Sequence, residues 1–400
     1  SITIMICNDC NNENHQESKF CQNCGTEIDL NNTTDAFSSR RYDVDSIRVI
    51  VLMLLILYHT AVSFQPWATD IFFIENKQSL EPFWHFAMNL INIWRIPILF
   101  VVSGMGLRFA MERRNWSTLI SDRALRIGLP LCFGTLCVVP IYIYIFNHYY
   151  GKDQFYSAHP GHLWFLANIF FYVLIFIYVF NFLKKHPENK LYIFLKKVIS
   201  KPLGIIPVFA SLIVIESVAV NPEVFPAFAF SLHGLFLGLV CFFNGFVLVS
   251  LKEDFWKPLQ EVKWVALILA VCLYGFRIYN YDSELISSRV VVNLLTGFES
   301  ANWMLAALGL GAAFLNKPSK LLSYMSSAVY PVYIVHMPIQ FFFCSLVFPL
   351  SITTSFKLII VLACTYAGSF LVYEIVKRIK WIRLLFGMKN ELIKNIKFGS

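Results

Sequence analysis

An arginine and a histidine in the first apolar run are the residues best suited to chemistry. This run opens with Asp45-Ser46-Ile47-Arg48, and His59 follows Arg48 by eleven residues. Asp45 and Arg48 are three residues apart, so a helix would place them on one face as an ion pair. His59 returns to that face about 16 Å deeper, after about three helical turns. A buried imidazole there could act as a general base on a hydroxyl or carry an acyl group briefly. A histidine that bonds a neighbouring helix for packing alone is the other interpretation.

Further arginines fall inside or beside the next two apolar runs. Arg95 lies in Trp94-Arg95-Ile96-Pro97, about the middle of the second run. A charge at this depth costs about 2.5–3.5 kcal/mol on insertion scales, so Arg95 should form an ion pair or bind an anionic group. Arg123 and Arg126 open the third run and share one helix face, which favours a phosphate cradle. The alternative is that these arginines only reflect membrane topology, because cytoplasmic loops are enriched in Lys and Arg.

Four residues are weaker candidates for binding the acceptor or supporting the catalytic groups. His162 and Trp164 begin the fourth run from its outer end, where aromatic residues are common in any membrane protein. His336 lies in a later run between two prolines. Glu299 could hold a sugar hydroxyl or neutralise Arg95.

The first residues of the chain contain two Cys-x2-Cys knuckles. The four cysteines are Cys7, Cys10, Cys21 and Cys24. This spacing is typical of a tetrahedral structural zinc site, with no position left open for catalysis. Two disulfides or a redox pair are the alternatives, although cytoplasmic thiols stay reduced and so short a segment forms little core without a metal. We expect a small zinc ribbon that regulates the protein or binds a protein partner.

The composition predicts a membrane protein. Of the 400 residues, 57% are hydrophobic and only 14% are charged, with a mean hydropathy of +0.59. Soluble domains contain about a quarter charged residues. The net charge of +8 therefore needs no nucleic-acid partner, because Lys and Arg collect in the cytoplasmic loops of membrane proteins. No signal peptide is expected at the start of the sequence.

Hydropathy divides the chain into an N-terminal polar segment and an all-α polytopic region. We expect a zinc ribbon over 5–30, a linker over 31–47, a ten-helix membrane domain over 48–378 and a basic tail over 379–400. Lys and Arg concentrate in alternate connections, which predicts that both termini are cytoplasmic. The ten expected spans are 48–65, 84–107, 124–146, 163–183, 203–221, 229–250, 262–279, 290–315, 327–349 and 354–377.

The order of these motifs resembles the membrane acyltransferase-3 family over about residues 40–390. Within it, the closest similarity is to enzymes that succinylate osmoregulated periplasmic glucans. The family-wide motifs are Arg48-x10-His59, Arg123-x2-Arg126, Phe100-x2-Ser103-Gly104 and His162-Leu-Trp-Phe-Leu. The motifs shared with the glucan-modifying enzymes are Asp45-Ser-Ile-Arg48, Arg126-Ile-Gly-Leu-Pro130, Tyr333-Ile-Val-His-Met-Pro338 and Tyr373-Glu-Ile375.

The resemblance implies a ten-helix enzyme of the bacterial cytoplasmic (inner) membrane that uses acyl-CoA as co-substrate. It implies that acetyl-CoA or succinyl-CoA donates its acyl group to an envelope carbohydrate. It makes Arg48 and His59 essential, and it places Arg123, Arg126 and Ser103 on the donor side. The zinc ribbon is not part of the family pattern, and Met337 stands where a second histidine would be expected.

Two other functions fit the composition. A transporter would also carry His, Arg and Glu at mid-membrane and helices broken by proline, but no internal duplication is visible in the sequence. A membrane sensor could use the zinc ribbon to recruit a partner. The sensor would need residues 1–36 and not His59.

Overall fold

The computed structural model describes residues 4–6, 13–15, 40–112, 116–283 and 285–388. The chain divides into two units, Ser1–Arg40 and Arg41–Ser400. In the first unit, β1 (Ile4–Ile6) pairs antiparallel with β2 (Glu13–His15). The four predicted zinc ligands lie outside the described residues, so the zinc ribbon stays a prediction.

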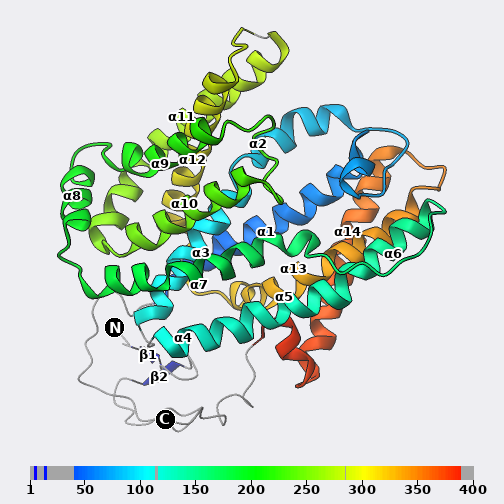
Figure 1. Cartoon of the computed structure of the whole chain (residues 1–400), viewed down its shortest axis with the longest axis horizontal. Helices are drawn as coiled ribbons and strands as arrows, with labels where there is room; N and C mark the ends of the chain where they lie inside the picture. The colour runs from blue at the N-terminus through cyan, green and yellow to red at the C-terminus, as the bar shows by residue number, and fades with distance from the viewer. Residues whose placement is uncertain (1–3, 7–12, 16–39, 113–115, 284, 389–400) are drawn as a thin grey trace. The chain divides into compact units, whose positions relative to one another are not determined.

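The described part of the second unit is entirely helical between its loops, as the all-α prediction requires (Figure 1). Short 3₁₀ helices are η1 (Ala68–Ile71), η5 (Gly161–Leu163) and η6 (Ile382–Phe386), and π-helical turns are η2 (Phe83–Met88), η3 (Ala124–Gly128) and η4 (Gly134–Val138). The α-helices are α1 (Tyr42–Val62), α2 (Asn89–Asn92), α3 (Arg95–Glu112), α4 (Trp116–Arg123), α5 (Leu129–Phe133), α6 (Val139–Tyr149), α7 (Trp164–Lys185), α8 (Lys190–Ile199), α9 (Ile205–Val220), α10 (Leu232–Val249), α11 (Glu253–Ser283), α12 (Arg289–Phe314), α13 (Lys320–Val347) and α14 (Thr354–Arg378).

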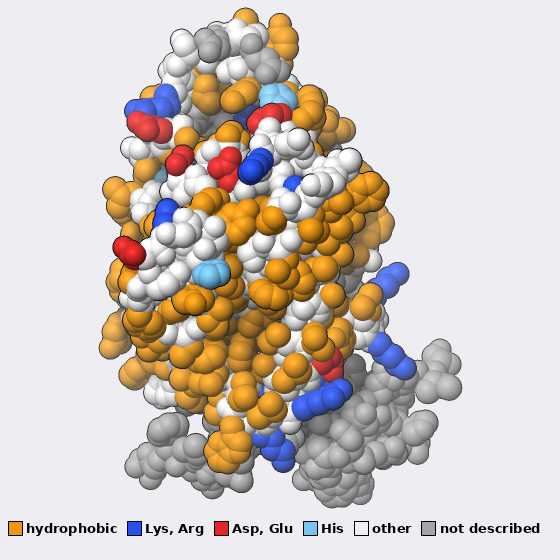
Figure 2. Space-filling model, turned by 90° about the vertical axis from the view of Figure 1, so that its right-hand side faces the viewer, with side chains coloured by type: hydrophobic (Ala, Val, Ile, Leu, Met, Phe, Trp, Pro, Cys, Tyr) orange, Lys and Arg blue, Asp and Glu red, His pale blue; other side chains and the backbone are white. Residues whose placement is uncertain are grey.

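Each of the ten expected spans overlaps a helix or a continuous helical stack. Within the described residues, eight helical segments are long and apolar enough to cross a bilayer, and α9 is a shorter apolar helix. Hydrophobic side chains cover much of the face shown in Figure 2, and charged side chains occur there in small groups. The polytopic all-α class is therefore confirmed. Helix α8 was not predicted, and it lies in the expected connection between the fourth and fifth spans.

Helix α1 packs against α3, α12, α13 and α14. Its apolar residues Val51, Leu55 and Ile56 are buried. The polar residues that α1 carries are therefore brought against several other helices.

Helix α3 is held tightly against α10. A side chain at Gly104 would come 1.9 Å from the Phe242 carbonyl oxygen, and one at Gly245 would come 2.0 Å from the Val101 carbonyl oxygen. Only glycine permits this approach of two backbones. Each helix places a glycine against the backbone of the other, so α3 is held in a fixed position relative to α10. The residues at the start of α3 are positioned with it.

Prolines remove backbone hydrogen bonds from the second and ninth expected spans. The second span is interrupted at Ile93 and Trp94, just before Pro97, so that α3 begins at Arg95. Helix α13 continues through Pro331 and Pro338 without a break. Each proline leaves a carbonyl four residues earlier without its usual helical donor.

Candidate active site

The expected pairing at the start of α1 is present. Arg48 Nη1 lies 3.1 Å from Asp45 Oδ1, and both side chains are partly exposed. His59 lies on the same helix near its other end. The three-residue spacing of Asp45 and Arg48 thus produces the ion pair that the helical period predicts.

His59 contacts His336 of α13. The His59 Nδ1 atom lies 2.9 Å from His336 Nε2, and the two rings are stacked with centroids 5.1 Å apart and planes 8° from parallel. His336 is fully buried, whereas His59 is partly exposed. His59 is therefore the member of the pair that a substrate can reach.

The acceptors around this pair determine the tautomers that we assign. His336 Nδ1 lies 2.7 Å from the Tyr333 carbonyl oxygen, which can only accept, so His336 carries its proton on Nδ1. His336 Nε2 then accepts from His59 Nδ1–H. The remaining nitrogen of neutral His59, Nε2, keeps its lone pair and can act as a base.

Residue Gln340 connects the same two helices one turn further along. Its Nε2 donates to the His59 carbonyl oxygen at 2.8 Å. His336 and Gln340 are four residues apart and lie on one face of α13. The backbone and the side chain of His59 are thus both held by α13.

His162 lies in the same cluster and is buried. Its Nε2 donates to the Ile334 carbonyl oxygen at 3.1 Å, and its ring centroid lies 5.1 Å from that of His336. The acceptor is available because Pro338, four residues after Ile334, has no N–H to donate. The Tyr333 hydroxyl also donates to the His162 carbonyl oxygen at 2.5 Å. Within the described residues His162 Nδ1 has no hydrogen-bond partner.

Arg95 begins α3 and is 3% exposed. Its guanidinium carbon lies 3.8 Å from the centre of the Tyr58 ring. Tyr58 directly precedes His59 in the chain. In the described part of the chain, its Nε and Nη1 have no hydrogen-bond partner. The interruption before it is stabilised by Ser300 Oγ, which donates to the Ile93 carbonyl oxygen that Pro97 leaves free.

The suggested pairing of Glu299 with Arg95 is wrong. Glu299 binds Arg277 of α11 instead, with Nε to Oε2 at 2.6 Å and Nη2 to Oε1 at 3.1 Å. Trp303 Nε1 donates to the same carboxylate at 3.2 Å. Arg277 lies within the expected span 262–279 and belongs to α11. It neutralises Glu299, which leaves Arg95 without a carboxylate from this residue.

The two arginines of the third span have different surroundings. Arg126 Nε forms an ion pair with Asp122 at 2.9 Å. Arg123 Nε is buried and lacks a partner among the described residues. Both lie within electrostatic range of Tyr330 on α13, as does Arg48. The arginines of the first and third spans therefore converge near one tyrosine.

The remaining candidates line the same region less directly. Ser103 is partly exposed on α3, and no side-chain hydrogen bond joins it to another described residue. The Trp164 ring lies 6.1 Å from that of Phe100 on α3. Among the described residues, no group of three or more His, Cys, Asp and Glu side chains is arranged to hold a metal ion.

Four contributors to the site were not among the sequence candidates. They gain their roles from contacts between helices, which a single sequence does not show. Two signals in the sequence could have pointed to this region: Pro338 frees the carbonyl four residues before it, and His336 and Gln340 are spaced four residues apart. The four residues are Tyr58, Tyr330, Tyr333 and Gln340.

Comparison with known proteins identifies the family of the chain. The acyltransferase-3 model, described as an acyltransferase domain, matches residues 41–374. The glucans biosynthesis protein C of Salmonella schwarzengrund is 24% identical over 391 residues, covering 88% of this chain and 95% of the relative. Its counterparts from Salmonella heidelberg and Salmonella enteritidis are 23% and 24% identical, with the same coverage.

No solved structure matches the chain. The family match nevertheless includes α1, α3 and α13, which carry the paired histidines and the buried arginine. It also extends over most of the second unit. The chain therefore belongs to the acyltransferase-3 family and is a membrane acyltransferase.

Proposed function

We propose that this acyltransferase moves an acetyl or succinyl group from cytoplasmic acyl-CoA to a hydroxyl of an envelope carbohydrate such as a periplasmic glucan. The observation that carries the proposal is the His59–His336 pair, which leaves a basic nitrogen on the partly exposed ring. The name of the relatives, glucans biosynthesis protein C, supports a glucan as acceptor. A multi-pass location in the cytoplasmic membrane of a bacterial envelope follows from this choice of donor and acceptor.

In the proposed reaction, His59 Nε2 takes the proton of the acceptor hydroxyl as its oxygen attacks the thioester carbonyl carbon. The tetrahedral intermediate then collapses, the C–S bond breaks, and the proton on His59 passes to the CoA thiolate. His336 accepts from His59 Nδ1–H throughout and stabilises the imidazolium that forms. The roles follow the pattern of a base that is oriented by a third group.

Arg95 supplies the electrostatic part of the mechanism. Its buried guanidinium has N–H groups without partners in the described chain and lies beside Tyr58. Such a group stabilises negative charge strongly, because little water competes with it. We assign it to the oxyanion of the intermediate, with a succinyl carboxylate as the alternative ligand.

The donor would bind at the cytoplasmic end of the same helices. Arg48, Arg123 and Arg126 all act electrostatically on Tyr330, and guanidinium groups suit the phosphates of a nucleotide. Ser103 lies between this region and Arg95 along α3 and would contact the pantetheine arm. Asp45 holds Arg48 in place through their ion pair.

The acceptor side would use His162, Trp164 and the neighbouring aromatic residues. Glu299, being bound to Arg277, would act on the acceptor only through the position of α11 and α12. The four N-terminal cysteines would hold a structural zinc ion, and the resulting ribbon would bind a protein partner without a part in the chemistry.

The decisive experiment is the release of free CoA from acetyl-CoA and succinyl-CoA by the purified protein with envelope glycans added. We expect release that requires the acceptor and that is lost in His59→Ala. His186→Ala is the matched control, since His186 is exposed at the end of α7 and should leave turnover unchanged. Equal release by wild type and His59→Ala would refute the catalytic assignment.

A further inference from the structure

The connection between α6 and α7 returns along α6 instead of passing directly across its end. The Tyr156 hydroxyl donates to the carbonyl oxygen of Leu136 at 2.8 Å, and Gly161 packs against the Tyr142 side chain. Leu136 precedes the end of α6 at Tyr149 by thirteen residues, or about 20 Å along the helix. Residues 151–160 therefore extend far back toward the centre of the helical unit.

The depth of this segment follows from its neighbours. Ile141 lines an apolar groove together with Ile339 and Gly368. Gly368 is near the middle of α14, and large apolar side chains such as Phe356 and Ile375 are exposed on both sides of it. The level of Ile141 is therefore within the apolar layer of the membrane.

The backbone of this segment is open. Residues 152–160 have no regular secondary structure, and nearly all of 151–160 is exposed. No backbone–backbone hydrogen bond joins residues 153–159 to another described residue. Unpaired backbone at membrane depth is tolerated only where protein buries it or where it lines an aqueous cavity. This segment must therefore face water or a polar ligand.

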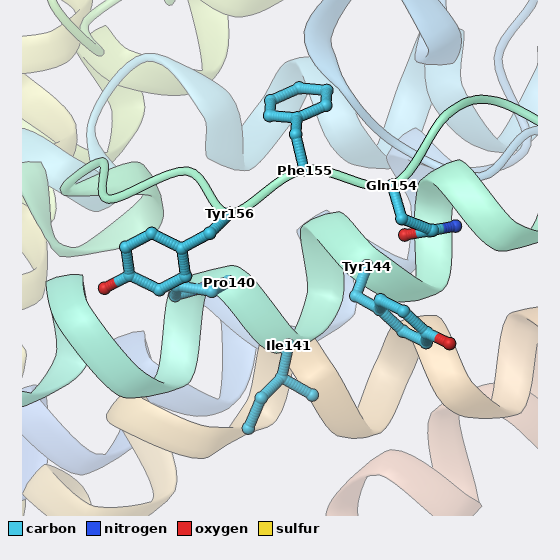
Figure 3. Close-up of a pocket in the computed structure, with 6 residues that line it drawn as sticks. All are labelled: Pro140, Ile141, Tyr144, Gln154, Phe155 and Tyr156. Atoms are coloured by element: carbon cyan, nitrogen blue, oxygen red, sulfur yellow. The ribbon is translucent and has the colours of Figure 1, made fainter.

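The side chains around the segment suit a sugar. A pocket of about 420 Å³ lies between the segment and α6 (Figure 3). In Figure 3, Gln154 and Tyr156 turn toward the helix, while Phe155 turns to the opposite side. Aromatic rings can pack on the C–H faces of a sugar, and amide and backbone groups can bond its hydroxyls. The pocket is lined by Pro140, Ile141, Tyr144, Gln154, Phe155 and Tyr156.

The inner end of the segment leads to the catalytic residues. It continues into η5 at His162, whose ring is next to that of His336. His336 in turn contacts His59. A chain of sugars lying along residues 151–160 would thus have one end near the proposed base.

We propose that residues 151–160 and the facing surface of α6 form the binding subsite for the acceptor carbohydrate. The proposal rests on the proposed function and specifies where its acceptor lies. Tyr144 and Tyr156 pack against sugar rings, and Gln154 and the open backbone bind hydroxyls. The subsite guides the acceptor hydroxyl toward His59.

Direct binding tests this subsite apart from catalysis. A short linear gluco-oligosaccharide would be titrated onto the full chain in lipid nanodiscs without acyl-CoA. We expect Tyr144→Ala and Gln154→Ala each to weaken binding about fivefold, the order expected for one lost aromatic or polar contact. Tyr156→Phe, which keeps the ring but loses the bond to Leu136, should bind nearly as well as wild type.

Tyr178→Ala is the matched control, because Tyr178 is 75% exposed on α7 and lines no part of this pocket. Unchanged affinity in Tyr144→Ala and Gln154→Ala, or no binding by wild type, would overturn the subsite. If binding depends on these residues but no CoA is released with any donor, the proposed reaction fails and the subsite stands. If CoA release depends on His59 but not on Tyr144 or Gln154, the proposed reaction stands and the subsite fails.

Access to water gives a second measurement. Gln154→Cys should react with a membrane-impermeant maleimide added from the outer side, whereas Phe342→Cys in the apolar groove should not. Phe342 is 49% exposed, so both positions are open to their surroundings. The labelling of the parent protein, which keeps its native cysteines, would be subtracted as background. Failure of Gln154→Cys to react would show that lipid covers the segment and would contradict the proposal.

Discussion

His336 Nε2 accepts a hydrogen bond from His59 Nδ1–H at 2.9 Å, while His336 Nδ1–H donates to the Tyr333 carbonyl oxygen. This relationship orients the His59 ring and fixes which of its nitrogens is basic. In the proposed mechanism the two histidines, one from α1 and one from α13, act as one unit.

Because the histidines act together, their losses should not add. We predict that His59→Ala lowers kcat about 10³-fold and that His336→Ala lowers it about 10²-fold, within the range for a general base and its orienting partner. The double variant should be no slower than His59→Ala. Steady-state CoA release would measure all three. Multiplicative losses would show that His336 acts independently of His59.

We expect Pro338 to lower the thermal stability of the protein while supporting its turnover. Pro338→Ala restores an N–H that can donate to the Ile334 carbonyl oxygen and compete with His162 Nε2. We predict a higher Tm together with about tenfold lower turnover, a loss at the lower edge of mutations that misplace a catalytic group. Pro331→Ala is the control, and it should raise Tm without the loss of turnover. Normal turnover in Pro338→Ala would remove His162 from the catalytic cluster.

Arg95 should act on the reacting carbonyl of every donor. We predict that Arg95→Met lowers kcat about 10²–10³-fold with both acetyl-CoA and succinyl-CoA, as the loss of an oxyanion donor does. The exposed Arg289 offers a control, because Arg289→Met removes an arginine whose ion pair is with the exposed Glu223. A loss confined to succinyl-CoA would reassign Arg95 to the carboxylate of the acyl group.

The Arg277–Glu299 pair should matter for stability more than for chemistry. Glu299 is fully buried, and Arg277 also donates to the Asn89 carbonyl oxygen. Glu299→Leu leaves the cation uncompensated and should reduce the free energy of unfolding by about 3–5 kcal/mol. Adding Arg277→Met should recover much of this loss. Denaturant unfolding in detergent would measure both, and an unaltered midpoint in Glu299→Leu would show that the pair contributes nothing.

The N-terminal cysteines should bind zinc without serving catalysis. We predict about one zinc ion per chain by elemental analysis and its loss in Cys21→Ser, because a four-thiolate site tolerates no missing ligand. CoA turnover should be unchanged in this variant. Loss of turnover together with zinc would give the ribbon a role in the reaction.

By itself the sequence determined the membrane class, the approximate helix positions and the alignment of Asp45, Arg48 and His59. These follow from local quantities, namely hydropathy over a bilayer thickness and the period of a helix. It also indicated which ionisable residues need an explanation, since a charge among apolar residues is visible without a structure.

The tertiary structure decided which of these residues meet. It paired His59 with His336, gave Glu299 to Arg277 and not to Arg95, and placed His162 beside the ninth span through a backbone that returns along α6. The first of these contacts joins residues that are 277 positions apart in the sequence. Periodicity ranks the faces of each helix but cannot specify which helix lies opposite, because in a largely apolar chain many faces are equally able to pack.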